Sequence, residues 1–209
     1  MRILHILNST SGGSAESTFD LTTELARNGV ASALVCADNG SAELKARIAA
    51  LFEGRALFLP LYWTNKKIRA KPWKRPLLEV YHLHRTWGGY KHQKLIQKFI
   101  LDHQIDLIHT STILNPEGAI AAKALGLPHL WHVRELLGPD KHFQFYNYRN
   151  WAARVLKDSR KLIANSEATR QCLLPFFPEE HIEKIPNAIR VGDFQIKTHR
   201  EKGRSWSVW

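Results

Sequence analysis

The sequence has little cysteine, with Cys36 and Cys172 the two thiols among 209 residues. Two cysteines are too few for the disulfide framework on which small secreted domains depend. Each lies in an apolar setting, Cys36 at the end of an expected strand and Cys172 in an expected helix. We therefore expect two buried free thiols and a reducing, cytoplasmic environment.

Long hydrophobic runs are also absent. The apolar stretch that opens the chain ends at Leu7, and the polar residues 8–14 follow it. A secretory signal needs about 7–15 consecutive apolar residues and a membrane-spanning helix about 20. We expect neither, so any contact with a membrane would be peripheral.

Acidic residues are scarce relative to basic ones: 19 Asp and Glu stand against 30 Lys and Arg, for a formal net charge of +11. Such a surplus favours polyanions, whether nucleic acid, anionic lipid surfaces or anionic cofactors.

Several catalytic signatures are missing from the chain. It has no P-loop and no G-x-S-x-G nucleophile elbow, and no Ser-His-Asp or Cys-His arrangement can be singled out. The eleven histidines include the pairs His82/His84 and His129/His132, which have no cysteine or third ligand at a suitable spacing. A strand would also send His129 and His132 to opposite faces. We expect no metal site.

What is present is an alternation of short apolar runs with amphipathic stretches. The expected strands are residues 3–7, 31–37, 56–61, 107–110, 129–133, 162–164 and 182–185. The expected helices are one that Ser14 caps and Gly29 ends, and residues 42–52, 91–103, 117–125, 143–157 and 167–174. This order predicts an α/β fold, a Rossmann-like parallel sheet with helices on both faces. We expect a single domain over residues 1–189, with residues 190–209 as a linker or tail.

Residues 63–87 interrupt this rhythm with a mixture of tryptophan and basic side chains. Lys and Arg favour anionic headgroups, and Trp favours the interfacial layer of a bilayer, so we expect contact with an anionic membrane surface. The contact residues would be Trp63, Lys66, Lys67, Arg69, Trp73, Lys74 and Arg75. Two alternatives stay open: a solvated loop whose tryptophans pack back on the domain, and a less favoured nucleic-acid surface.

The first loop, residues 8–14, joins the first strand to the first helix. The carboxyl ends of parallel strands line the ligand crevice of an open α/β sheet. Gly12 and Gly13 would let the backbone approach a phosphate or a sugar closely, at the positive end of the helix. The local alternative is a tight turn without a ligand.

Three residues close the fifth expected strand at the same edge. His132 can bond a sugar hydroxyl or a developing charge, and the forked guanidinium of Arg134 can grip a phosphate. The alternative is that His132 is a satisfied strand-end histidine and that Arg134 and Glu135 form a local ion pair.

Two polar signals follow the last two expected strands. Ser166, after Asn165, is well placed to cap the helix at residues 167–174, and capping is a sufficient explanation for it. Pro186 and Asn187 indicate a turn or hinge.

Taken in order, these motifs resemble the N-terminal, acceptor-side domain of the retaining GT-B glycosyltransferases of the large bacterial group 1 family. The matching features are the opening strand with Gly12 and Gly13, a strand ending in His109, His132 after the next strand, the serine-capped helix at Asn165-Ser166, and the phrase Ile-Pro-Asn at residues 185–187. Residues 190–194 resemble the linker toward a second domain. The resemblance covers almost the whole chain.

The resemblance implies a sugar transferred from a nucleotide-sugar donor to a lipid-linked or polysaccharide acceptor, with retention at the anomeric carbon. It implies a missing C-terminal domain with a basic pair and a Glu-x7-Glu segment, and therefore an isolated chain that is inactive or nearly so. It implies no cofactor and no metal, and a role in cell-envelope polysaccharide synthesis at the cytoplasmic membrane face. His132 would be the catalytic residue; the donor- and acceptor-binding residues would be Gly12, Gly13, Ser14, Glu16, His109, Arg134, Glu135, Asn165, Ser166 and Asn187.

Two other classes stay open. A nicotinamide-dependent oxidoreductase domain would share the sheet, and Asp38 ends the second strand as such a domain requires, but the third glycine of the fingerprint is missing. A non-enzymatic module that binds anionic lipid or nucleic acid would explain the charge of +11.

Overall fold

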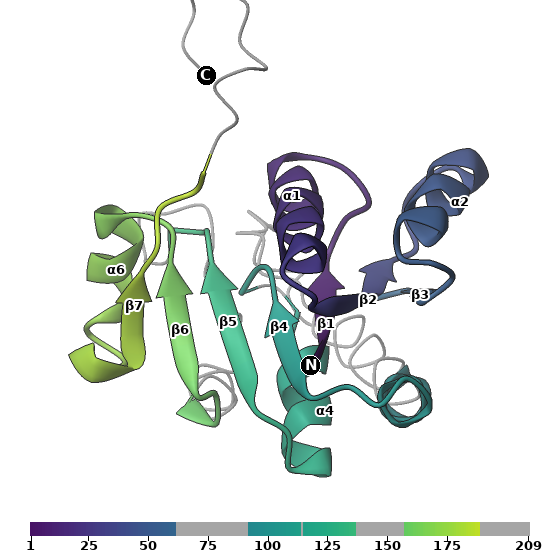
Figure 1. The fold of residues 1–209 in the computed structure, drawn as a ribbon. Coiled ribbons are helices and arrows are strands. Elements are labelled where there is room, and N and C mark those ends of the chain that lie inside the picture. Colours follow the sequence, from purple (N-terminus) through teal and green to yellow (C-terminus); the bar gives the residue numbers. More distant parts are fainter. Residues whose placement is uncertain (62–91, 114, 137–156, 189–209) are drawn as a thin grey trace, which may run out of the picture.

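The computed structural model describes residues 1–61, 92–113, 115–136 and 157–188. Within them, seven strands form one sheet in the order β3-β2-β1-β4-β5-β6-β7, and every neighbouring pair is parallel (Figure 1). The strands are β1 Arg2–Leu7, β2 Ala31–Ala37, β3 Ala56–Leu59, β4 Leu107–Thr110, β5 His129–Val133, β6 Lys161–Ala164 and β7 Ile182–Lys184. The predicted Rossmann-like α/β fold is confirmed.

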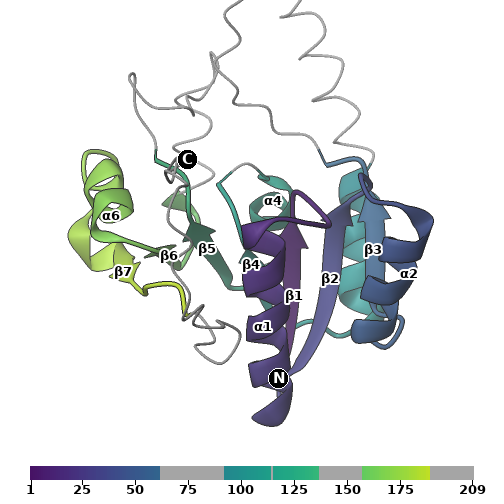
Figure 2. The same cartoon turned by 90° about the horizontal axis from the view of Figure 1, so that it is seen from above.

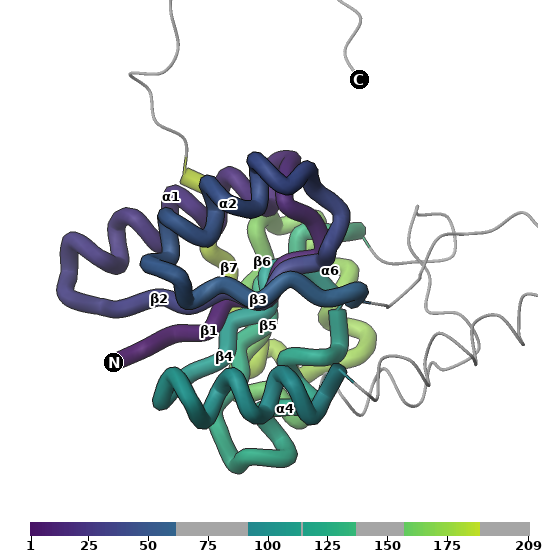
Figure 3. The backbone as a smooth tube through the Cα atoms, turned by 90° about the vertical axis from the view of Figure 1, so that its right-hand side faces the viewer, coloured from purple at the N-terminus to yellow at the C-terminus, as the bar shows by residue number. Residues whose placement is uncertain are grey.

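Helices cover both faces of this sheet. They are α1 Gly13–Arg27, α2 Ala42–Leu51, α4 Glu117–Leu125 and α6 Glu167–Leu173, with the 3-10 helix η2 Glu179–His181; residues 92–102 are also helical. Figure 3 shows α1 and α2 on one side of the sheet and α4 on the other. The expected helix at residues 143–157 and the basic-aromatic segment at residues 63–87 lie outside the described residues, as does the tail at residues 190–209.

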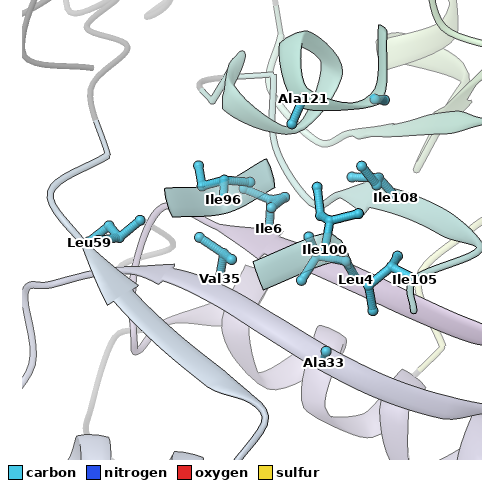
Figure 4. Close-up of a cluster of buried hydrophobic side chains, with 11 residues drawn as sticks. Leu4, Ile6, Ala33, Val35, Leu59, Ile96, Ile100, Ile105, Ile108 and Ala121 are labelled. Atoms are coloured by element: carbon cyan, nitrogen blue, oxygen red, sulfur yellow. The ribbon is translucent and has the colours of Figure 1, made fainter. Parts of the chain in front are cut away.

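The alternation of side chains along β1 explains why both faces are apolar. Leu7 packs toward α1 and α2 in one cluster, whereas Leu4 and Ile6 pack toward residues 92–102 and α4 in another. Figure 4 shows the second cluster, in which Ile96 and Ile100 lie over the strands. A parallel strand buried on both faces needs such a continuous apolar run, which is what the opening of the sequence has.

The start of α1 differs from the prediction. The helix begins at Gly13 with Gly12 as its N-cap, so the prediction that Ser14 caps it is wrong. The reason is that the carbonyl of Gly12 accepts hydrogen bonds from the amides of Ala15 and Glu16, both at 3.0 Å, which places Ser14 inside the first turn. The other end agrees with the prediction, because Gly29 has φ 72° and terminates the helix in the left-handed region.

Smaller differences concern element ends and one thiol. The strands β3 and β7 end earlier than expected, at Leu59 and Lys184, and η2 was not expected. Cys36 is buried and Cys172 half-buried, and both are free, so the prediction of two buried thiols is right only for Cys36. None of the helices in the described ranges is long and apolar enough to cross a bilayer.

The order of the strands reverses between β1 and β4. The chain runs outward from β1 through β2 to β3, returns to the other side of β1 at β4, and continues outward to β7. Figure 2, seen from above, shows the strands in this order with α1 and α4 on opposite sides of the sheet. Ligands of open α/β sheets bind outside the carboxyl ends of the strands at such a reversal.

Candidate functional site

The glycine loop between β1 and α1 is held from beneath by the loop that follows β2. The amide and the hydroxyl of Thr10 donate to Oδ1 of Asn39 at 3.1 and 3.2 Å, and Nδ2 of Asn39 donates to the carbonyl of Asn8 at 3.3 Å. Gly12 has φ 92°, a conformation that favours glycine. A Cβ at Gly12 or Gly13 would meet no atom within 4 Å, so open space adjoins the backbone at the start of α1.

The four predicted site residues at the start of α1 differ in exposure and charge. Gly12 and Gly13 are exposed and Ser14 is half-buried. Glu16 is the acidic residue of the first turn, where it complements the positive end of the helix. The exposed backbone of Gly12 and Gly13, at the positive end of α1, therefore suits an anionic or polar ligand.

Three histidines from neighbouring strands lie on one face of the sheet. His5 of β1 and His109 of β4 are opposite each other in register, and their Nδ1 atoms are 3.0 Å apart. His109 pairs in register with Leu130 of β5, so His132 lies on the same face, two residues nearer the carboxyl edge. The ring centroids of His109 and His132 are 5.7 Å apart. The histidines thus form a line from the interior to the crevice.

Burial keeps these rings neutral. Burial is the main reason that the pKa of His5 lies well below the usual value, and the neighbouring His109 lowers that pKa further. Burial, then the charge of Arg134, lowers the pKa of His109 to about 4. Burial, then the charge of Arg134, and then His109 lower the pKa of His132 to about 3. At neutral pH the rings are therefore hydrogen-bonding groups without charge.

Arg134 connects this line to the carboxyl end of β7. Its Nη2 is 3.3 Å from Nδ1 of His132, and its Nη1 donates to Oδ1 of Asn187 at 3.3 Å. Burial lowers the pKa of the guanidinium, whereas the charge of Glu135 raises it. Asn187, 53 residues beyond Arg134 in the sequence, is thus brought to the pair of His132 and Arg134 by a side-chain contact.

Glu135 ties the loops after β4 and β5 together. Its carboxylate accepts hydrogen bonds from the hydroxyl of Thr112, from the amide of Ile113 at 3.1 Å and from the amide of Arg134 at 3.2 Å. Among the described residues no ion pair joins the side chains of Arg134 and Glu135, so the alternative of a simple local ion pair does not describe this site.

Asn165 and Ser166 follow β6 at the same edge, but their side chains serve the start of α6. Oγ of Ser166 accepts from the amide of Thr169 at 3.1 Å, which confirms the predicted cap. Oδ1 of Asn165 accepts from the hydroxyl of Thr169 at 2.7 Å. The two residues therefore shape this edge while their polar atoms hold the helix.

Sequence reasoning missed several polar residues beneath the site. His5 is fully buried inside the apolar run of β1, and a polar residue within such a run was the available signal. The hydroxyl of Thr18 in α1 donates to Oγ of Ser111 after β4 at 2.9 Å, which fixes α1 across β1 and β4. The pairing of Thr112 with Glu135 has no sequence signal, because it depends on two loops that meet only in the fold.

Two buried nitrogens of the site stand out because they lack a hydrogen-bond partner within the ranges that the structure covers. They are Nε2 of His132 and Nε of Arg134. Buried polar atoms in folded proteins are nearly always paired, so such atoms at a crevice mark a place where a ligand can bind. In the same ranges no group of three or more His, Cys, Asp and Glu side chains is placed to hold a metal ion.

His129 shows the contrast with a purely structural histidine. Its Nε2 is 2.8 Å from the hydroxyl of Thr110 and its Nδ1 is 2.8 Å from the hydroxyl of Ser159, so both ring nitrogens are partnered. It lies on the opposite face of β5 from His132, as the sequence predicted.

Comparison with protein families decides what kind of chain carries this arrangement. Residues 11–192 match the family described as Glycosyltransferase Family 4. The chain belongs to glycosyltransferase family 4. The matched range includes the site residues described above, from Gly12 in the glycine loop to Asn187. A search of curated proteins found no match.

Solved structures similar to this family 4 chain share its fold. The Anabaena protein HepE, in complex with UDP, superposes with a TM-score of 0.60 at 17% identity over 92% of this chain and 45% of its own. A glycosyltransferase from Rickettsia africae gives a TM-score of 0.53 at 20% identity over 88% and 42%. The Arabidopsis thaliana protein UGT89C1, complexed with UDP, gives a TM-score of 0.53 at 14% identity over 91% of this chain and 50% of its own.

The chain therefore spans about half the length of the solved structures that it matches. At these identities the likeness establishes the fold, a Rossmann-like half of the GT-B architecture. Sugar-nucleotide epimerases share that fold too, as in the Neisseria meningitidis enzyme bound to UDP-GlcNAc, with a TM-score of 0.54 at 14% identity over 88% of this chain and 45% of its own. Family membership, and not the fold, distinguishes this chain from the epimerases.

Proposed function

We propose that this chain is the acceptor-side half of a retaining glycosyltransferase that moves a sugar from a nucleotide-sugar donor to a lipid-linked or polysaccharide acceptor. Family membership and the UDP complexes of HepE and the Arabidopsis enzyme support a nucleotide-sugar donor. The observation that carries the proposal is Nε2 of His132 at the carboxyl edge of β5, which is buried and has no partner among the residues that the structure describes.

In this proposal the glycine loop after β1 and the His132 side chain on β5 meet the two substrates from either side of β4. The amides at Gly12 and Gly13 lie near the donor diphosphate and offer hydrogen bonds to the charge that develops on the leaving group. His132 bonds the sugar in transit, and His109 supports its ring from the interior. Ser14 and Glu16 border the same space.

The remaining predicted residues shape the acceptor side. Arg134 and Glu135 form its wall, because their contacts join the loops after β4, β5 and β7. Asn165 and Ser166 form the floor through the start of α6, and Asn187 marks the hinge toward a second domain. The mechanism needs no metal and no cofactor besides the nucleotide-sugar substrate.

The proposed cellular setting follows from the basic character of the chain. An acceptor linked to lipid lies at the cytoplasmic membrane face, and a chain of net charge +11 is attracted to anionic headgroups. The basic-aromatic residues 63–87 would make that contact. Flotation with vesicles that do and do not contain anionic lipid tests this part, with Trp63→Ser/Trp73→Ser as the variant that should release the chain.

Activity is tested with labelled nucleotide sugars on residues 1–209 alone and on the product of the full parent gene. We expect no turnover by residues 1–209, and transfer with retention by a longer product with a second domain. Replacing His132 with Ala in that product should lower kcat by about 10²–10³-fold. His181→Ala, in the exposed turn η2, is the matched control and should retain activity.

Two results would count against the proposal. Robust turnover by residues 1–209 alone would show that the chain is not a half-enzyme. Steeply salt-dependent binding to anionic lipid or nucleic acid, without any interaction with a nucleotide sugar, would favour the binding-module alternative.

A further inference from the structure

We propose that Arg134 is a positioning residue that holds the proton of the neutral His132 ring on Nε2, so that this nitrogen can only donate a hydrogen bond. The role of that bond toward the sugar in transit rests on the proposed function. The position of the proton does not, because it follows from contacts within the chain.

The first step concerns the contact between the two side chains. A guanidinium has five N–H donors and no acceptor. Nη2 of Arg134 lies 3.3 Å from Nδ1 of His132, so it is the donor and Nδ1 is the acceptor. A neutral imidazole carries one proton, and with Nδ1 unprotonated that proton lies on Nε2.

The second step concerns what holds Arg134 in place. Its Nη1 donates to Oδ1 of Asn187 after β7, and its backbone amide donates to the carboxylate of Glu135. Glu135 is in turn bound to Thr112 and to the amide of Ile113 after β4. The guanidinium is thus held by Asn187 at the end of β7, and the backbone of Arg134 is held through Glu135 at the ends of β4 and β5, so its orientation toward His132 does not depend on His132 alone.

The third step concerns charge. The charged and titratable groups around the His132 ring, within the described chain, are His109 of β4 on one side and Arg134 with its neighbour Glu135 on the other. Burial, the Arg134 charge and His109, in that order, lower the pKa of His132 to about 3. The ring therefore keeps a single proton throughout the neutral range.

These steps exclude one role for His132 and leave another. Nδ1 is occupied by Arg134 and Nε2 already carries the proton, so the ring cannot serve as a general base in this state. The free Nε2–H is buried and has no partner among the described residues. It therefore selects an acceptor oxygen on the ligand, and we expect no contribution of His132 to the pH dependence of transfer between pH 5 and 8.

The test is nitrogen-15 NMR of residues 1–209 labelled at histidine, with two-bond proton–nitrogen correlations that distinguish the ring nitrogens. The spectrum of His132→Gln identifies the His132 signals. We expect an unprotonated Nδ1 and a protonated Nε2 that do not change from pH 8 to pH 6. A proton on Nδ1, or a ring that titrates near the usual 6.5, would overturn the inference.

Variants separate positioning from packing. Arg134→Met should give a mixture of both tautomers and a pKa of His132 that rises toward 6.5, and Arg134→Lys, which restores a cationic donor, should recover the Nε2–H form. Asn187→Ala removes the second partner of Arg134 at an exposed position and should admit part of the Nδ1–H form. Arg47→Met, at an exposed site on α2, is the matched control and should change neither.

Each outcome is separable from the fate of the proposed function. Unchanged tautomers in Arg134→Met and Asn187→Ala would overturn the positioning role, even if a longer product transfers sugar. If the longer product transferred sugar from none of the nucleotide sugars tested, the proposed function would be wrong, and the inferred position of the proton would still stand.

Discussion

Acidification from pH 8 to pH 5 is expected to destabilise this domain severely, because its fold buries histidines in the neutral form. The clearest cases are His109, His129 and His132, whose pKa values burial lowers to about 4, 3 and 3. His109 and His129 are 5% and 3% exposed, so water does little to offset this effect.

The direction of the effect follows from proton linkage. In the unfolded chain each ring has a pKa of about 6.5, above its value in the fold. Below about pH 6.5 the unfolded chain therefore binds the additional protons, and the free energy of unfolding falls as the pH falls toward 4. The stability contributed by neutral burial is complete above pH 6.5.

The magnitude follows from the difference between the two pKa values. One pKa unit corresponds to about 1.4 kcal/mol, so at pH 5 each of the three rings costs about 2 kcal/mol and together they cost about 6 kcal/mol. Domains of this size have a total free energy of unfolding of about 5–15 kcal/mol. We expect these three rings to contribute a slope of about 4 kcal/mol per pH unit below pH 6, and the buried His5 to add to it.

The assay is urea unfolding followed by circular dichroism at intervals from pH 8 to pH 5. His132→Gln should reduce the slope by about 1.4 kcal/mol per pH unit, and His181→Gln, in the exposed helix η2, should leave it unchanged. Hydrogen bonds with Gln171 and then with Lys184 lower the pKa of the surface carboxylate of Glu167 to about 2. This group therefore affects the stability only in more acid solution. A free energy of unfolding that is flat from pH 7 to pH 5 would refute the reasoning.

Three substitutions and one thiol reaction further test the site and its supports. Glu135→Gln should lower the free energy of unfolding by about 2 kcal/mol in urea titrations, because a carboxylate with three hydrogen bonds loses its charge. Gly12→Ala should cost about 1–3 kcal/mol because of φ 92°, whereas Gly13→Ala, in open space at a helix start, should be neutral or stabilising; equal effects would contradict the structure. A thiol reagent at pH 8 should modify the half-buried Cys172 and leave Cys36, whose pKa burial raises to about 12, intact until the protein unfolds.

Much of the fold was predictable from local signals. The apolar run that became β1 and the glycine that ends α1 each act over a few residues, so period and composition were enough to place them. The cap at Ser166 was also predictable, because a serine before a helical pattern binds an amide three residues later. The cap of α1 was not, since Gly12 and Ser14 both suit a helix start and the backbone conformation of the loop decided between them.

The residues of the site were likewise predictable from local signals, whereas their contacts were not. His132, Arg134 and Asn187 were predicted as separate residues from their positions after strands, which is a local property of the sequence. Their mutual contacts were not predictable, because β5 and β7 are separated by β6 in the sheet and no residue pattern gives the reach of the Arg134 side chain.

By itself, then, the amino-acid sequence determined the α/β class, most strand and helix positions and the polar residues that end each strand, because these depend on interactions between near neighbours. The tertiary structure alone decided the strand order and the alignment of His5 with His109. It also decided that Nε2 of His132 is buried without a partner in the described chain. The physical reason is that burial and hydrogen bonding between distant strands set the protonation of these rings, and both exist only once the sheet has formed.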